Sequence, residues 1–176
     1  MNRSRLFAVL GFIVIGVLSR LIPHPPNFTA INTIALFGAF YLGNRTLPFL
    51  TVFASLFLSD LVYGFHSTMP VVYLSFGLTT LLGYQLKNKM SGYRLPLCCA
   101  VGSLTFFFLV NFGVWLSTDL YPKTIEGLEL CYVAAIPFLM NQILGDLTYA
   151  VLLLGSLVFY RNGFKIWSDS FNIYKP

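Results

Sequence analysis

Charged side chains are scarce in this sequence of 176 residues: only 10% are Asp, Glu, Lys or Arg, and only six are acidic. A soluble domain usually carries about 25% charged residues, so this chain has too few to cover a water-facing surface. Hydrophobic residues make up 57%. The uncharged runs at 61–86 and 95–118 suit membrane-spanning helices, which need about 20 apolar residues. The composition therefore predicts an integral membrane protein.

Cysteine and histidine are also few, with three Cys and two His. Cys98 and Cys99 are adjacent and Cys131 is distant, a spacing that fits no metal site, so we expect these residues to serve packing. The chain has no HExxH motif, no nucleophile elbow and no GxxxxGK[ST] phosphate loop. Each motif would supply a recognisable chemistry. We therefore predict no catalytic residue, no metal and no cofactor, and an enzyme is the least favoured class.

The basic residues indicate orientation rather than nucleic-acid binding. The net charge is +5, but the Lys and Arg side chains stand at the ends of apolar segments and not along one stripe. With six membrane spans, nine of the eleven basic residues fall on one side, which the positive-inside rule makes cytoplasmic. We expect a multi-pass protein of the inner (cytoplasmic) membrane with both termini cytoplasmic and no nucleic-acid partner.

Hydropathy divides the chain into six apolar segments, at about 6–21, 29–43, 47–64, 70–86, 95–116 and 131–160. They predict an all-α membrane protein, a six-transmembrane-helix bundle over residues 1–161, with a short cytoplasmic or interfacial tail at 162–176. The second segment is short and is expected to span only part of the bilayer. Pro137, near the start of the last segment, is expected to kink it.

Residues 20–29 (RLIPHPPNFT) form the most unusual connector. Its three prolines do not fit inside a regular helix, so we expect a stiff loop that holds Arg20, His24 and Asn27 on the outer side. A plain capped turn between two helices is the alternative.

Polar residues within the predicted spans fall at the level of this loop. Asn141, Gln142 and Asp146 share one helical face, which must point inward because an Asp facing lipid costs about 2.5–3.5 kcal/mol. Arg20 and Asp60 are placed to form an ion pair. We predict a pocket for a small polar organic molecule; interhelical hydrogen bonding is the alternative. The predicted site residues are Arg20, His24, Asn27, Asp60, Tyr73, Asn111, Asn141, Gln142 and Asp146.

Several motifs resemble an uncharacterised family of bacterial integral membrane proteins that are classed with transport proteins. They include RLIPHPPNFTA at 20–30, ALFGA at 35–39, NFGVW at 111–115 and GDL at 145–147. By architecture the family is similar to the S components of energy-coupling factor (ECF) importers. That resemblance implies six helices, a vitamin-sized outer pocket closed by the loop between the first two helices, and a coupling transmembrane subunit with ATPases as partners.

We therefore predict a substrate-binding, S-component-like subunit for uptake of a small water-soluble nutrient, such as a vitamin or its precursor. The expected partners are the substrate, the lipid bilayer and the coupling subunits. Two alternatives remain at this point. One is a self-sufficient secondary carrier in which Asp60 or Asp146 couples protons, and the other is a membrane scaffold that transports nothing.

Overall fold

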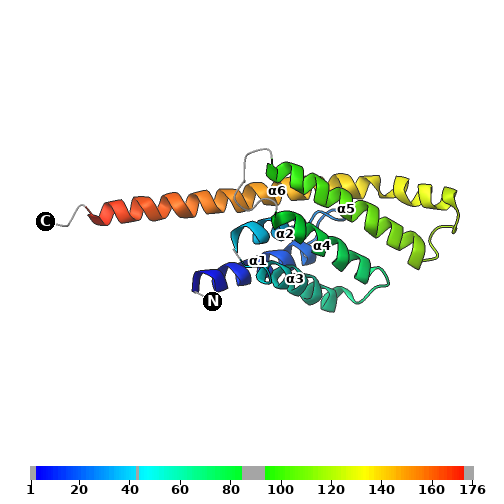
Figure 1. The fold of residues 1–176 in the computed structure, drawn as a ribbon, viewed down its shortest axis with the longest axis horizontal. Helices are drawn as coiled ribbons and strands as arrows, with labels where there is room; N and C mark the ends of the chain where they lie inside the picture. The colour runs from blue at the N-terminus through cyan, green and yellow to red at the C-terminus, as the bar shows by residue number, and fades with distance from the viewer. Residues whose placement is uncertain (1–2, 43, 85–93, 173–176) are drawn as a thin grey trace.

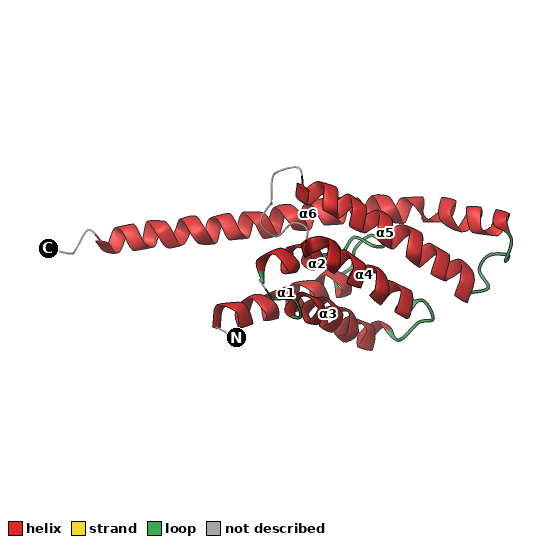
Figure 2. Cartoon of the chain, viewed as in Figure 1, coloured by secondary structure: helices red, strands yellow, loops and turns green. Residues whose placement is uncertain are grey.

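The computed structural model describes residues 3–42, 44–84 and 94–172, and over these residues it is all-helical (Figures 1 and 2). Each predicted apolar segment corresponds to one helix. The helices are α1 (Arg3–Leu21), α2 (Ile31–Tyr41), α3 (Leu47–Tyr63), α4 (Met69–Gly83), α5 (Arg94–Ser117) and α6 (Ile125–Asn172).

The last helix is longer than its hydropathy predicts. It begins at Ile125 rather than near residue 131, contains Pro137 without interruption, and ends at Asn172. The segment predicted as a tail, 162–176, is thus helical as far as Asn172, and its last four residues lie outside the described part of the chain. In Figure 1 this end of α6 extends beyond the other helices, on the side where α1 begins.

In the described part of the chain, two helices are long and apolar enough to cross a membrane. They are α5 and the part of α6 from Ile125 to Ser156, with mean hydropathies of 2.0 and 1.4 over their most apolar 18 residues. The helices α2, α3 and α4 are apolar but shorter, with 11, 17 and 15 residues. Length and composition therefore allow a membrane location.

The short helix α2 is the centre of the bundle. Nine of its eleven residues are buried, as expected for a helix that is apolar on all sides. It packs against each of the other five helices. At about 1.5 Å per residue it is about 16 Å long, roughly half the thickness of a membrane's hydrocarbon core.

Close packing of α2 against α4 depends on Gly83. A Cβ atom at this position would lie 2.7 Å from the Ala39 Cβ and 2.9 Å from the Leu36 Cα. Both distances are shorter than van der Waals contact. Gly11, in contrast, is exposed on α1 and has nothing within 4 Å of a Cβ position.

We predict that Gly83→Ala lowers the free energy of unfolding by about 1–3 kcal/mol, because the added methyl group overpacks the interface between α2 and α4. Gly11→Ala is the matched control and should leave stability unchanged or raise it by up to about 1 kcal/mol, through helix propensity alone. Unfolding of the purified variants measures both changes. Equal stability of the two variants would contradict the packing described for α2.

Candidate binding site

A cavity of about 600 Å³ lies within the bundle. This is within the range of about 300–1,000 Å³ that is typical of small-molecule pockets. Residues from all three connections at one end of the bundle line it, among them His24 after α1, His66 after α3 and Tyr121 after α5. In Figure 1 the α3–α4 and α5–α6 connections lie at the end opposite the start of α1. The cavity therefore extends to the end of the bundle where these connections lie.

Most predicted site residues line this cavity. Three of them do not line it. Asp60 contacts Arg20, and Tyr73 contacts Asp60. Asn141 is half-buried outside the lining. The lining residues that were predicted are Arg20, His24, Asn27, Asn111, Gln142 and Asp146.

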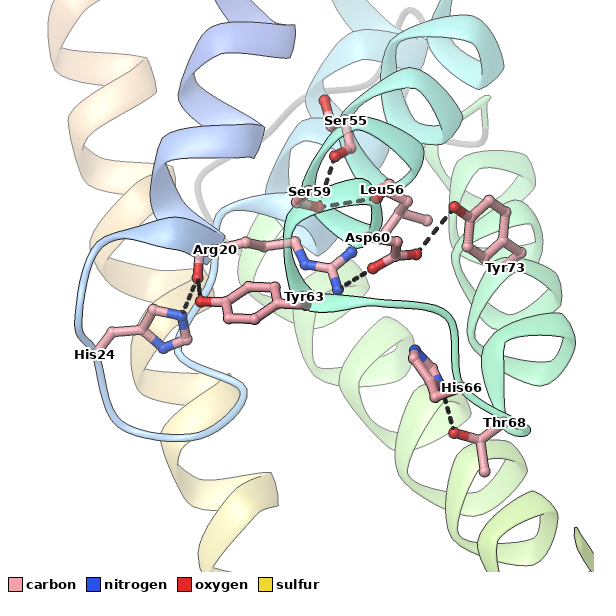
Figure 3. Close-up of polar contacts among 10 residues, drawn as sticks. All are labelled: Arg20, His24, Ser55, Leu56, Ser59, Asp60, Tyr63, His66, Thr68 and Tyr73. Atoms are coloured by element: carbon pink, nitrogen blue, oxygen red, sulfur yellow. Dashed lines mark hydrogen bonds and ion pairs between the residues drawn. The ribbon is translucent and has the colours of Figure 1, made fainter.

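The predicted ion pair between Arg20 and Asp60 is present. Arg20 Nη2 lies 2.6 Å from Asp60 Oδ1, and the two side chains are 17% and 1% exposed. The Tyr73 hydroxyl, from α4, donates to the other carboxylate oxygen at 3.0 Å. Figure 3 shows Arg20 reaching across from the end of α1 toward Asp60 and Tyr73. This cluster connects α1, α3 and α4 beside the cavity.

The backbone of Arg20 anchors the proline-rich loop as well. Its carbonyl oxygen accepts a hydrogen bond from the Tyr63 hydroxyl and lies 3.1 Å from His24 Nε2 (Figure 3). The loop reverses at Asn27, whose φ of 66° is in the left-handed region that Asn tolerates better than most residues. Asn27 thus has a conformational role in addition to its place in the lining.

The loop also packs closely on α6. A Cβ at Gly145 would lie 3.1 Å from the Phe28 Cα, so a glycine lets the loop backbone approach the helix. The Phe28 and Tyr149 rings are 6.0 Å apart, centre to centre. The loop is therefore held at the end of α1 through His24 and packs on α6 through Phe28.

Asp146 organises the part of the cavity wall where α2, α5 and α6 meet. Its side chain is fully buried, at 0% exposure. Asn32 Nδ2 donates to Asp146 Oδ2 at 2.6 Å, and the Ser103 hydroxyl donates to the same oxygen at 2.5 Å. The Thr33 hydroxyl donates to the Asp146 carbonyl at 3.1 Å. The carboxylate thereby connects α2, α5 and α6.

Four buried polar atoms in the described part of the chain have no hydrogen-bond partner: Arg20 Nη1, Asn32 Oδ1, Gln142 Oε1 and Gln142 Nε2. All three residues line the cavity. Leaving such a group buried and unpaired costs about 1–3 kcal/mol. All four atoms are themselves buried, so a ligand in the cavity would reach them only after these side chains move.

Asn32 lines the cavity but is not among the predicted site residues. The sequence offers one signal for its role, which is that two polar residues, Asn32 and Thr33, stand near the start of an otherwise apolar segment. Tyr63 and His66 also line the cavity without having been predicted to do so. Within the described ranges, no three His, Cys, Asp or Glu residues are grouped so that they could hold a metal ion.

Residues 1–167 of the sequence match the family of unknown function DUF6580. The chain belongs to this family. The match agrees with the resemblance to an uncharacterised family, and it assigns no activity or partner. No curated protein and no solved structure matches the chain. The cavity and its contacts are therefore the basis for the functional argument.

We predict that Asp60→Ala destabilises the protein by about 3–5 kcal/mol, because it leaves the Arg20 guanidinium largely buried without a counter-charge. Tyr73→Phe removes one hydrogen bond and should cost about 1–2 kcal/mol. The double variant Arg20→Met with Asp60→Leu should be more stable than Asp60→Ala, since no charge is left unpaired. Unfolding measurements on the three variants test this order, and a double variant as unstable as Asp60→Ala would contradict it.

Proposed function

We propose that this protein is a membrane-embedded substrate-binding subunit for uptake of a small water-soluble nutrient, resembling the S components of ECF importers. The observation that carries the proposal is a cavity of about 600 Å³ that is lined by polar side chains from several helices, such as Arg20, Asn111 and Gln142, together with aromatic rings. A scaffold whose polar residues serve only packing would have no use for a cavity of this size. A small polar molecule would fit it.

The surface of the bundle supports a membrane location. Large apolar side chains are exposed on several helices, for example Phe7 at 71%, Val62 at 69% and Val151 at 70%. Such a surface is stable in lipid and a liability in water. With six crossings, the positive-inside rule puts both termini in the cytoplasm and the cavity on the outer side, where a nutrient arrives.

Energy would have to come from elsewhere. The sequence contains no GxxxxGK[ST] loop, which is the element that binds nucleotide phosphates in many ATPases. The site offers hydrogen-bonding and aromatic groups for recognition rather than the paired acid, base and nucleophile of an enzyme. We therefore propose capture without catalysis, with a coupling subunit and ATPases as partners.

Asp146 favours a second candidate, a self-sufficient proton-coupled carrier. Its carboxylate is fully buried, and its hydrogen-bond partners among the described residues, Asn32, Ser103 and Thr33, are all uncharged. A carboxylate in such surroundings needs a proton or a cationic group to offset its charge, and buried carboxylates often serve as proton relays in transporters. Asp60 is less suited to this role because Arg20 already pairs with it.

Ligand capture is tested by incubating the purified full-length protein with a metabolite extract, washing it, and identifying retained molecules by mass spectrometry. We expect at least one small polar molecule to be retained in about equimolar amount and to raise the melting temperature. Ala134→Trp should reduce retention about tenfold or more, a loss of at least about 1.4 kcal/mol of binding free energy. Ala134 lines the cavity but is exposed, so the larger side chain should not prevent folding.

Val133→Trp is the matched control, since Val133 is also exposed on α6 but does not line the cavity. It should retain as much ligand as the unmodified protein. Failure of the unmodified protein to retain any molecule, or equal retention by the two Trp variants, would contradict capture in this cavity.

The carrier is tested with proteoliposomes that contain this chain alone. Uptake of the retained molecule should follow an imposed proton gradient, stop on addition of an uncoupler, and be lost in Asp146→Asn, which keeps the shape of the side chain but not its titrating group. Uptake that occurs only when coupling ATPases are added would rule out this candidate and favour the substrate-binding subunit.

A further inference from the structure

We infer that the side of the bundle formed by α3 and α4 binds phospholipids with short acyl chains and thins the outer leaflet of the bilayer beside it. The inference rests on the membrane location in the proposed function, and it adds the kind of lipid that covers one face of the protein. The lengths of the helices, their exposed side chains and the residues that connect them all support it.

The helices on the two sides of the bundle differ in length. At about 1.5 Å per residue, the 17 residues of α3 and the 15 residues of α4 are about 26 Å and 23 Å long. The 24 residues of α5 are about 36 Å long, which exceeds the hydrocarbon core of about 30 Å. Because tilting makes a helix cover even less of the bilayer, α3 and α4 fall short of this core by at least about 4 Å and 7 Å.

The shortfall lies at the end of the bundle that carries the cavity. Figure 1 shows the α5–α6 connection farther from the start of α1 than the α3–α4 connection. At the other end the helices are level, because Gly83 of α4 adjoins Leu36 of α2, and Leu36 shares a hydrophobic cluster with Leu95 near the start of α5. If α5 crosses the whole core, the outer leaflet beside α3 and α4 must be thinner.

Large apolar side chains are exposed on both short helices. Those on α3 include Leu61 and Val62, at 56% and 69%, and those on α4 include Leu74 and Leu81, at 56% and 52%. Such a surface needs an apolar partner. Helix interfaces within a membrane are enriched in small residues that let backbones approach closely. These bulky side chains therefore fit lipid better than a second copy of the chain.

The connection between α3 and α4 contains no long cationic side chain. A helix that is too short for the bilayer is accommodated by snorkelling of flanking residues, by oligomerisation or by thinning of the bilayer. Residues 64–68 are Gly-Phe-His-Ser-Thr, and the stretch 47–83 contains no Lys or Arg. His66 and Ser67 are exposed, and covering such polar groups with acyl chains is costly. Thinning of the bilayer avoids that cost.

The thinner leaflet would also give access to the cavity. Tyr63 and His66, at the outer end of the short side, both line the cavity. A bilayer of ordinary thickness would cover this end with acyl chains, whereas a thinned outer leaflet brings water to it. A water-soluble nutrient would then reach the cavity from the α3–α4 side.

The test compares the lipids around two single tryptophans in the full-length protein. Trp115 and Trp167, the two tryptophans of the sequence, are first replaced by Phe. Leu58→Trp then reports on α3, and Leu104→Trp, the matched control, reports on α5. The two leucines lie near the middle of their helices and are 44% and 42% exposed. The protein is reconstituted in brominated dioleoyl phosphatidylcholine, which quenches tryptophan fluorescence on contact, and dimyristoleoyl phosphatidylcholine is added as a competitor with shorter chains.

We expect the short-chain lipid to relieve quenching of Leu58→Trp at least about twofold more effectively than quenching of Leu104→Trp, because it matches the shorter helices. Equal relief at the two positions would overturn the inference. Quenching of Leu104→Trp but not of Leu58→Trp would overturn it too, since a protein partner would then cover α3. Leu61→Trp is the second reporter on α3 if the melting temperature shows that Leu58→Trp does not fold.

The proposed function is tested separately by retention from the metabolite extract. A retained molecule together with equal lipid preference at the two positions would overturn only the inference about lipids. A preference for short chains beside α3 without any retained molecule would overturn ligand capture alone. Quenching at neither position would place both helices outside the bilayer and overturn the membrane location as well.

Discussion

The fully buried carboxylate of Asp146 is the constraint around which the rest of the bundle is arranged. It accepts hydrogen bonds from Asn32 on α2 and Ser103 on α5, at 2.6 Å and 2.5 Å, and it belongs to α6. These hydrogen bonds hold three helices together at one point. Because Asn32 is the second residue of α2, they also fix where α2 begins. A Cβ at Gly102 would lie 2.6 Å from Asn32 Oδ1, so a glycine on α5 leaves room for the amide that reaches the carboxylate.

The same arrangement leaves the cavity wall incompletely paired. Asn32 donates through its NH₂ group to acceptors of the protein. Among the described residues, its oxygen has no donor and the Gln142 side-chain amide has no hydrogen-bond partner. Arg20 uses Nη2 for the ion pair with Asp60, and its Nη1 is buried without a hydrogen-bond partner among the described residues. Unpaired buried groups reduce stability by about 1–3 kcal/mol each. All four atoms belong to residues that line the cavity but are themselves buried, so the side chains would have to move before a ligand could pair with them.

Much of the fold was predictable because each helix is a long apolar segment bounded by polar or charged residues, which gives a strong hydropathy pattern. The helical face of Gln142 and Asp146 followed from spacing alone, and the pair of Arg20 with Asp60 followed from their shared level. The end of α6 at Asn172 could not be predicted from hydropathy. Arg161 and Lys165 end the apolar run, but a helix can continue through charged residues. Asn32 was not assigned to the site because a single amide at the start of an apolar segment is equally typical of interhelical packing. Only the fold brings it to Asp146.

A high-resolution structure of the protein purified from the cells that produce it naturally tests the central claim most directly. Ordered density for a small polar molecule should lie in the cavity, in contact with lining residues such as Arg20, Asn111 and Gln142. Density for a lipid acyl chain in the cavity, or a cavity that holds only ordered water, would contradict it.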